Sequence, residues 1–500
     1  MVKKLIVCIL VLFVFLAGCG SSSDNGSGSQ AQELYNQAAA QDKTGNYYTA
    51  YNYYQMAQQQ FINEKNSTMA SQSRADKFRV QKITMSYPYD SSQMEALLAE
   101  KYTFLSMAVK QGWMDDNLLD CMFMDGKNMY FSGAIDNMLF RYTNYFPEDA
   151  PIWPSLNELR TPILAMINNA PPYDDKPYIN PIRYLGTFTV NVSRRSFPQK
   201  GTLRLWMPFP INTDCQKDIE IVAIEPAEFH VSGPDINADL GNVYFEIPLE
   251  KLKGDLDVKV QFKYTSYQQN FTVDPSKVGE YDKTSSLYTT NTASEGNYTI
   301  TPEIMAKAKE IVGSETNPYL QAQLLYNYVI TNIKYSYMPH LAIEQLGIPE
   351  SVYVHTHGYG DCGSQSMYLS ALCRAVGIPA RATGGYQVLS EGGAGHFWGE
   401  IYLPNYGWVP NDTTIAESLT ISPYNNKQDD ENIRNFYFGR LDAKRYVIQK
   451  SVDLPLNPPA SEPRSMTATL QSPNAECPEM FNDPNWVIED GFKSSIVPVE

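Results

Sequence analysis

The sequence predicts an α+β protein with antiparallel sheets, and three observations indicate this class. Helix-forming residues dominate the first part of the chain, from 31 to 175. Apolar and polar residues then alternate at period two over 182–283, which is typical of half-buried strands. Helical patterns return after 295 and are followed by alternating stretches up to 450, which predicts a domain of mixed helices and strands. Residues 451–500 are a C-terminal extension.

Length and composition exclude several classes of protein. At about 150 residues per domain, 500 residues allow roughly three domains. Hydrophobic residues make up 43% of the chain and charged residues 19%, which is a globular composition rather than that of a disordered protein. The 39 basic and 55 acidic residues give a net charge of −16, which repels nucleic-acid phosphates. We therefore expect no nucleic-acid partner.

The N-terminus has the pattern of a secretory signal. Two lysines precede an unbroken apolar run, Leu5–Leu16, which is too short to span a membrane. The run ends in LAGC, which resembles the lipobox of bacterial lipoproteins, where the cysteine becomes the lipidated first residue of the mature chain. The resemblance implies a signal peptide over 1–18 and a lipid on Cys19 that anchors the protein to a bacterial membrane, outside the cytoplasm. A plain cleaved signal or a short membrane anchor is the alternative.

Residues 19–30 follow as a lipid-anchored flexible tether, because GSSSDNGSGSQ has no side chains able to pack. Seven cysteines in 500 residues are too few for a disulfide scaffold. Removal of the signal and lipidation of Cys19 leave Cys121, Cys215, Cys362, Cys373 and Cys477. How these five cysteines pair in an oxidising compartment does not follow from the sequence.

Residues 31–175 are predicted to be helical. The part up to about 81 lacks proline and has one break, at Gly45-Asn46, which indicates a helical hairpin. Small and aromatic residues follow the spacing of the second helix of a tetratricopeptide repeat: Gly45, Tyr47, Ala50, Tyr54 and Ala57. This resemblance implies a protein partner for the N-terminal helices, and an ordinary tyrosine-rich hairpin fits as well. Further along, MEALLAEKYTFLSMAV and LRTPILAMINN are the clearest helical pieces.

The region 182–283 predicts an antiparallel, sandwich-like sheet domain. Apolar residues alternate with polar ones in Phe188–Val192, Leu203–Met207 and Leu256–Tyr264, and turn residues separate these stretches.

One stretch inside this domain partly matches a calcium-binding loop. Asp235, Asn237, Asp239 and Glu246 occupy positions one, three, five and twelve of that template. Leu240 stands where the template requires glycine, and both flanking segments have the pattern of strands where helices are needed. A polar connection between two strands is the better interpretation.

The segment GYGDCGSQSMYLSALCRAVGIPAR is the most informative part of the chain. Four residues share one helix face at i, i+3, i+4 and i+7: Leu369, Leu372, Cys373 and Val376. Gly377 supplies the signal that ends this helix. Cys362 precedes the first residue of the apolar face and therefore lies at the start of the helix. Free N–H groups and the helix dipole favour a thiolate there, so we expect a lowered pKa for Cys362. Cys373 lies about 16 Å further along the helix, too far for a disulfide with Cys362, and is expected in the core.

Downstream, the segment AGHFWGEIYLP predicts a strand. By period two, His396, Trp398 and Glu400 share one face of it. A thiol nucleophile needs a neighbouring imidazole to accept its proton, and the imidazole needs a third group to fix its tautomer. Asp412 follows one short turn and a second strand, so it is able to return beside His396.

The Cys362 helix with its GIPAR ending, the HFWGEIYLP strand and the GWVPND strand, in this order, resemble the transglutaminase-like superfamily. The similarity covers roughly 300–450 and extends to NIKYSY upstream and FYFGRLD downstream. It implies a papain-like core over 295–450, in which a helix carrying the cysteine packs on an antiparallel sheet. By this resemblance Cys362 is the nucleophile, His396 the general acid/base and Asp412 the residue that orients the imidazole.

Several details of the site stay open. Four residues are candidates for lining the cleft: Asp361, Gly363, His357 and Trp398. Thr413-Thr414 follows Asp412 where the family more often has Pro-Thr, which leaves the turn there undefined. The second oxyanion donor, typically an upstream Trp or Gln, is not assignable. His355 and His357 lie two apart, but no partner set with zinc spacing accompanies them, so we expect a cleft-lining loop, no metal and no cofactor.

The resemblance implies acyl transfer from an amide or peptide through a thioester on Cys362. Water as the acceptor would make the protein a cysteine peptidase or amidase, which we favour, and an amine would make it a cross-linking transglutaminase. The expected substrate is a peptide, a protein or an envelope polymer. Two alternatives remain. One is a non-catalytic adaptor protein of the envelope, and the other is that the resemblance to the family is fortuitous.

Overall fold

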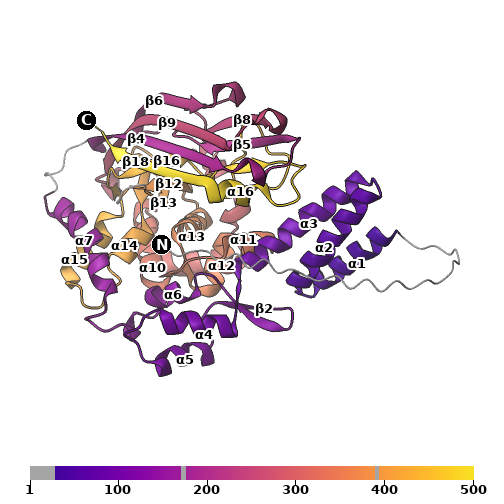
Figure 1. Ribbon diagram of the computed structural model, residues 1–500. Helices are drawn as coiled ribbons and strands as arrows, with labels where there is room; N and C mark the ends of the chain where they lie inside the picture. Colours follow the sequence, from indigo (N-terminus) through magenta and orange to yellow (C-terminus); the bar gives the residue numbers. More distant parts are fainter. Residues whose placement is uncertain (1–28, 170–175, 389–392, 500) are drawn as a thin grey trace, which may run out of the picture.

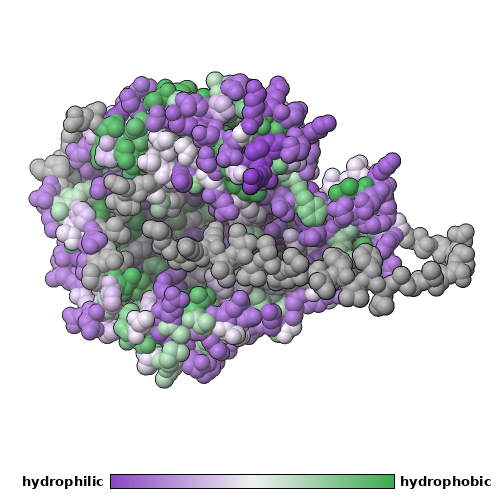
Figure 2. All heavy atoms as spheres, in the orientation of Figure 1, coloured by the Kyte–Doolittle hydropathy of each residue, from purple (hydrophilic) through white to green (hydrophobic). Residues whose placement is uncertain are grey.

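The computed structural model describes residues 29–169, 176–388 and 393–499. Two sheets lie at the top of the view in Figure 1, the helices of the central part lie beneath them, and the N-terminal helices lie at the bottom and to the right. Hydrophilic side chains cover most of the face seen in Figure 2. The predicted class is confirmed, since helices accompany sheets that are antiparallel apart from one two-residue pair.

Residues 30–86 form three helices: α1 Gln30–Lys43, α2 Tyr47–Asn63 and α3 Ser67–Ser86. The sequence predicted a hairpin with a single break, and a flexible tether that includes Gln30. The chain turns a second time before Asn66, whose side chain accepts a hydrogen bond from the N–H of Met69 at 3.2 Å and so caps α3. Ala50 and Ala57 are completely buried, because small residues let the helices approach closely.

The remainder of the N-terminal region contains α4 Ser91–Glu100, α5 Met107–Asp115, α6 Ala134–Arg141 and α7 Ile152–Asn168. The piece predicted as one helix, MEALLAEKYTFLSMAV, is split because Lys101 is extended and Ser106 caps a new helix. A small sheet also replaces predicted helix: β1 Tyr89–Asp90, β2 Cys121–Met124 and β3 Lys127–Tyr130. Its hairpin turns at Asp125-Gly126, where both residues have positive φ.

Two antiparallel sheets enclose one apolar core. Their strands over 178–270 are β4 Tyr178–Val192, β5 Thr202–Pro208, β6 Gln216–Glu225, β7 His230–Ser232, β8 Asn242–Pro248 and β9 Leu256–Asn270. Later segments add β15 Arg440–Leu441, β17 Asn474–Glu476 and β18 Phe492–Pro498. The strand orders are β15-β9-β4-β18, with β6 paired to β9, and β17-β5-β8-β7. The C-terminal extension therefore completes both sheets.

The central part carries helices α8 Ser286–Asn291, α9 Pro302–Val312, α10 Pro318–Asn332, α11 His340–Gln345, α12 Glu350–His357, α13 Cys362–Ala375, α14 Thr413–Ser418 and α15 Lys427–Phe436. Its strands are β10 Lys334–Tyr335, β11 Tyr359–Gly360, β12 Ala380–Gln387, β13 Ala394–Leu403, β14 Gly407–Asn411 and β16 Arg445–Gln449. Four of these strands form an antiparallel sheet of order β14-β13-β12-β16. Helix α13 packs against β12 and β13, so the cysteine helix lies directly on this sheet.

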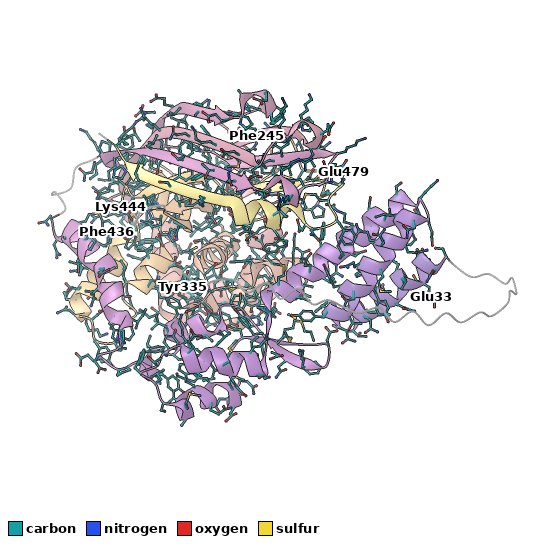
Figure 3. The ribbon with its side chains drawn as sticks, viewed as in Figure 1. Glu33, Phe245, Tyr335, Phe436, Lys444 and Glu479 are labelled. Atoms are coloured by element: carbon teal, nitrogen blue, oxygen red, sulfur yellow. The ribbon has the colours of Figure 1, made fainter. Side chains whose placement is uncertain are left out.

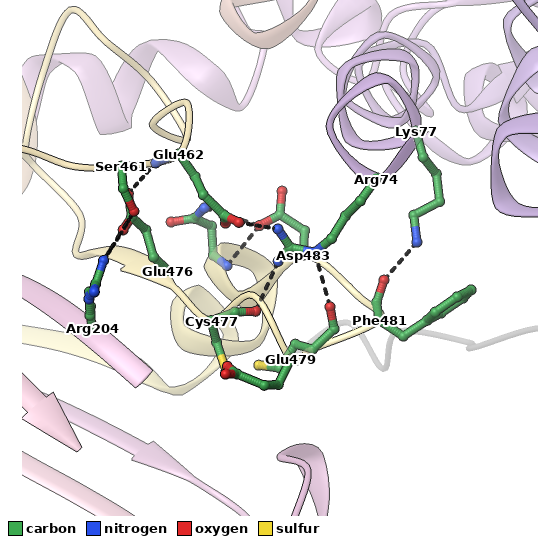
Figure 4. Close-up of polar contacts among 12 residues, drawn as sticks. Arg74, Lys77, Arg204, Ser461, Glu462, Glu476, Cys477, Glu479, Phe481 and Asp483 are labelled. Carbon is green, nitrogen blue, oxygen red and sulfur yellow. Dashed lines mark hydrogen bonds and ion pairs between the residues drawn. The ribbon is translucent and has the colours of Figure 1, made fainter. Parts of the chain in front are cut away.

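The C-terminal extension, which also contains α16 Pro484–Gly491, is fastened to α3. Arg74 donates a hydrogen bond to the carbonyl oxygen of Cys477 at 3.0 Å, and Lys77 donates one to that of Phe481 at 2.7 Å (Figure 4). Lys77 is almost completely buried, and this burial lowers its pKa to about 8. Two cationic side chains of α3 thus bind the backbone of the C-terminal extension, about 400 residues further along the chain.

The polar stretch that partly matched a calcium loop connects strands β7 and β8. Asp239 forms an ion pair with Lys450 at 3.0 Å, and Glu246 accepts a hydrogen bond from the hydroxyl of Tyr244 at 2.7 Å. Over 29–169, 176–388 and 393–499, no group of three or more His, Cys, Asp or Glu side chains is placed to hold a metal.

The described residues contain no helix of the length and apolarity that crossing a membrane requires. The predicted signal peptide and lipidation site at Cys19 lie outside these residues.

Candidate active site

Cys362 is the first residue of α13. The side chain of Asp361 caps this helix, because its Oδ1 accepts a hydrogen bond from the N–H of Ser364 at 3.0 Å. The chain leaves the helix at Gly377, which has a φ of 84°. Cys373, further along the same helix, is completely buried in the core. The helix start and the helix stop therefore lie where the sequence predicts them.

His396 and Asp412 lie on neighbouring strands of the central sheet. His396 belongs to β13, and Asp412 directly follows β14, which returns antiparallel to β13 with Asn411 opposite Gly399. Nε2 of His396 is 2.8 Å from Oδ2 of Asp412, and both side chains are buried. Nδ1 of the ring has no hydrogen-bond partner in the part of the chain that the structure describes. This nitrogen remains for exchange of a proton.

The carboxylate of Asp412 is completely buried and ionised. Burial by itself would raise its pKa, but His396 and the guanidinium of Arg445, which is 2.8 Å from Oδ2, lower the pKa to about 2. Oδ1 accepts a hydrogen bond from the N–H of Ile415 at 3.0 Å. Asp412 therefore caps α14, and Thr413 simply begins that helix. This defines the turn that the sequence left open.

Arg445 is a site residue that the sequence analysis missed. Besides Asp412, its guanidinium binds Oδ2 of Asp442 at 3.0 Å, and Asp442 in turn accepts a hydrogen bond from the amide of Gln387 at 3.0 Å. Arg445 is 33 residues from Asp412 in the chain. Only the pairing of β16 with β12 brings it close, so no local spacing could indicate it.

The thiol of Cys362 lies beside β13, at Phe397, the residue that follows His396. The backbone N–H of Phe397 hydrogen-bonds the sulfur. A Cβ atom at Gly363 would lie 3.4 Å from the Phe397 ring, so the first turn of α13 is in close contact with this strand. Cys362 and Phe397 also pack in one small apolar cluster. The structure thus brings the predicted nucleophile to the strand that carries the predicted base.

The pKa of Cys362 is raised, so the expectation of a lowered value was wrong. Burial disfavours the thiolate, and the adjacent charge of Asp361 adds to this effect. Hydrogen bonds from the N–H groups of Phe397 and Gly363 favour the thiolate but do not compensate. A helix start favours the thiolate, but the burial of Cys362 outweighs this effect. The thiol is therefore protonated at neutral pH and needs a base when it attacks.

A second histidine, His340, is partly buried beside the start of the cysteine helix. Nε2 of His340 is 2.5 Å from Oδ2 of Asp361, and its Nδ1 is 2.7 Å from Oε1 of Glu350. Burial alone would lower its pKa, but the two carboxylates outweigh burial and raise the pKa of His340 well above its usual value. Protonated His340 balances the charge of Asp361 next to Cys362. No motif in the sequence indicated this contact.

The four residues predicted to line the cleft lie in different environments. Asp361 lines a pocket of about 560 Å³. Gly363 is buried against β13. Trp398 is completely buried in the core and lines no open cleft, because residues on both faces of β13 are covered.

His357 was expected in a loop and instead ends helix α12. Its ring stacks on Tyr353, with 3.9 Å between the ring centres. His355, the other member of the pair, has Nδ1 3.0 Å from the hydroxyl of Tyr368. The two histidines thus contact different partners.

Two tyrosines lie within electrostatic reach of Cys362. Burial raises the pKa values of Tyr335 and Tyr337, and negative charge on Cys362 raises both further. Tyr335 packs against Phe140 of α6, with 4.7 Å between the ring centres, where the N-terminal region meets the central part (Figure 3). The NIKYSY segment was noted in the sequence, but not this position.

Comparison with known proteins agrees with the geometry. Residues 305–413, which include Cys362, His396 and Asp412, match the model of the Transglutaminase-like superfamily. This part of the chain is a transglutaminase-like domain. An uncharacterized protein of Haemophilus influenzae is 23% identical over 331 residues, which cover 58% of this chain and 84% of that protein.

Two solved structures share a loose overall similarity. One is a proposed cysteine protease from Cytophaga hutchinsonii, with 12% identity and a TM-score of 0.37 over 65% of this chain and 92% of that one. The other is the periplasmic domain of TgpA from Pseudomonas aeruginosa, with 13% identity and a TM-score of 0.25 over 52% of this chain and 96% of that one.

The ionised Asp412 predicts a specific acid sensitivity. Because its pKa falls from 3.8 to about 2 on folding, its charge contributes stability that is complete above about pH 4 and is lost as the pH falls through about 2. Between about pH 4 and pH 2, the free energy of unfolding of Asp412→Asn should fall by about 2 kcal/mol less than that of the parent. Urea unfolding at each pH measures both values. Asp257→Asn, at an exposed position of β9, is the matched control. Equal acid dependence in the parent and Asp412→Asn would contradict the assignment.

The raised pKa of Cys362 predicts slow alkylation of the free protein. Iodoacetamide at pH 7 should modify Cys362 more slowly than glutathione in the same tube, and the rate should keep rising as the pH is raised past the pKa of an ordinary thiol, about 8.5. Peptide mass spectrometry distinguishes Cys362 from the exposed Cys121. Labelling of Cys362 that is fast at pH 6 would instead indicate a resident thiolate.

Proposed function

We propose that the protein is a cysteine acyl-transfer enzyme that cleaves amide or peptide bonds, with water as the favoured acceptor. One observation carries this proposal: the buried hydrogen bond between Nε2 of His396 and Asp412, on the strand against which the Cys362 helix packs. That bond fixes the tautomer and orientation of the imidazole and leaves Nδ1 for the thiol proton.

In the proposed reaction, Sγ of Cys362 attacks the carbonyl carbon while its proton passes to Nδ1 of His396. The tetrahedral intermediate collapses to a thioester, and the leaving amine takes the proton from His396. Water then attacks the thioester with His396 as the base, which releases the carboxylic acid and restores the thiol. The raised pKa of Cys362 supports this order, because a protonated thiol needs a base at the moment of attack.

Asp412 stays ionised throughout this cycle at any pH above about 4, because its pKa is about 2. It therefore stabilises the imidazolium that forms when His396 holds the thiol proton. Arg445 keeps the carboxylate ionised and in place. At the start of α13, the N–H of Ser364 already donates to Asp361 and that of Gly363 to the thiol. The N–H of Cys362 has no acceptor within the helix and is available to the oxyanion.

We further propose that the enzyme acts outside the cytoplasm, tethered to a bacterial membrane through a lipid on Cys19. The LAGC motif and the Gly/Ser-rich segment behind it support this location. Such a tether restricts the substrates to peptides, proteins or polymers of the envelope. The three N-terminal helices are then available to a protein partner there.

The proposal is tested with the soluble body from Gln30 and a panel of fluorogenic peptide amides. Cys362→Ala and His396→Ala should each lower kcat by at least about 10³-fold, because nucleophile and base act as one unit. Cys373→Ala, on the same helix, is the matched control for loss of a thiol. Addition of glycine ethyl ester and mass analysis of the products separate hydrolysis from transfer to an amine. Full activity in Cys362→Ala would refute the proposal, and an inactive parent would favour a binding protein.

Tyr335 is our candidate for the second oxyanion donor. Among its interactions with other charges, the one with Cys362 raises its pKa most, and its hydroxyl has no hydrogen-bond partner in the described part of the chain. Tyr335→Phe keeps the ring contact with Phe140 and should lower kcat about 10²-fold with little change in KM. Tyr337→Phe is the neighbouring control. A larger loss in Tyr337→Phe would contradict the assignment.

A further inference from the structure

A pocket of about 560 Å³ lies where three parts of the chain meet. Its apolar wall comes from the N-terminal region, the central part and the C-terminal extension: Met85, Phe131, Met338, Leu341, Met466 and Trp486. The volume is within the range of about 300–1,000 Å³ that is typical of small-molecule sites. Asp361, the residue before Cys362, also lines it. The pocket therefore lies beside the start of the cysteine helix.

A second, smaller pocket of about 160 Å³ shares Leu341, Met466 and Trp486 with the first. It extends to Gln471, whose side-chain amide donates hydrogen bonds to the carbonyl oxygens of Gly385 at 2.7 Å and His396 at 2.9 Å. Together the two pockets follow the C-terminal extension from the residue before the nucleophile to the backbone of the proposed base.

Met466 lies at the junction of these pockets. It lines both of them and packs in the same small apolar cluster as Cys362 and Phe397. Its thioether side chain is only partly buried, and methionine readily adopts several shapes. Met466 therefore connects both pockets with the cluster that contains Cys362.

The larger pocket has no unpaired charge to offer a ligand. Its charged groups already have partners: Asp136 is 2.7 Å from Nζ of Lys101, and Asp361 is 2.5 Å from His340, which also lines the pocket and is 2.7 Å from Glu350. The rest of the lining is apolar, aromatic or small and polar. A charged substrate side chain would lose its water there without gaining a partner, whereas an aromatic or large aliphatic one would gain apolar burial.

Building on the proposed function, we propose that the larger pocket is the subsite for the residue that donates the acyl group, and that it selects a bulky uncharged side chain. Met466 is the residue that limits the size of that side chain. The substrates are then peptides or proteins cleaved after aromatic or large aliphatic residues. Because two of the pocket's walls lie outside residues 305–413, this selectivity belongs to the whole chain rather than to its transglutaminase-like domain.

The test uses N-acetyl-amino-acid coumarylamides with Ala, Leu, Phe, Glu or Lys as the acyl residue. For the parent body from Gln30, we expect kcat/KM for Phe and Leu to exceed that for Glu and Lys at least 10-fold. Met466→Trp should lower the Phe-to-Ala ratio of kcat/KM at least 10-fold. Ser132→Trp adds a bulky ring to the pocket from the N-terminal region, at an exposed position, and should act in the same direction. Met107→Trp, which is 55% exposed on α5, is the control and should keep the parent ratio.

Turnover without side-chain preference, or an unchanged ratio in both pocket variants, would overturn the subsite. If no amide is turned over, the proposed function fails, and binding to Cys362→Ala then decides the subsite separately. Isothermal titration with N-acetylphenylalanine amide and N-acetyllysine amide should show tighter binding of the former, weakened at least 10-fold in Cys362→Ala/Met466→Trp. Equal binding of the two amides would overturn it.

Discussion

The buried carboxylate of Asp412 is the group on which the rest of the site depends. A charge without water is tolerated only when hydrogen bonds and opposite charges surround it, and Asp412 has both. His396 and Arg445 bind one oxygen, and the first turn of α14 binds the other. These partners come from β13, β16 and α14. Satisfying one carboxylate therefore fixes three elements relative to one another, and with them the imidazole.

A second consequence is that the site is not built by the transglutaminase-like domain alone. Gln471, in the C-terminal extension, binds the backbone of His396, and the same extension supplies strands to both sheets. Lys77 and Arg74 of α3 hold that extension from the other side. The N-terminal helices, the extension and strand β13 are thus connected through direct contacts. A protein bound to those helices would act on an element that touches the proposed base.

Local sequence patterns predicted the helices and strands that carry the site. They did not predict the contacts between segments that are distant in the sequence. The cap at Asp361, the stop at Gly377 and the alternation around His396 are encoded within a few residues, so helix start, helix end and strand could be predicted. Arg445 and His340 have no such signal, because only folding brings them to Asp412 and Asp361. The raised pKa of Cys362 escaped prediction for the same reason, since burial is a property of the assembled chain. The hairpin at Asp125-Gly126, by contrast, has a local signal, because Asp-Gly favours the positive φ angles of a two-residue turn.

The central claim is that an acyl group is carried on the sulfur of Cys362, and rapid-quench mass spectrometry tests it most directly. The soluble body is mixed with a peptide ester or amide, quenched in acid within milliseconds to seconds, and digested. The account predicts a gain of the acyl mass on the peptide that contains Cys362, removed by hydroxylamine and absent from Cys373. Product formation without any adduct on Cys362, or with an adduct on another residue, would contradict it.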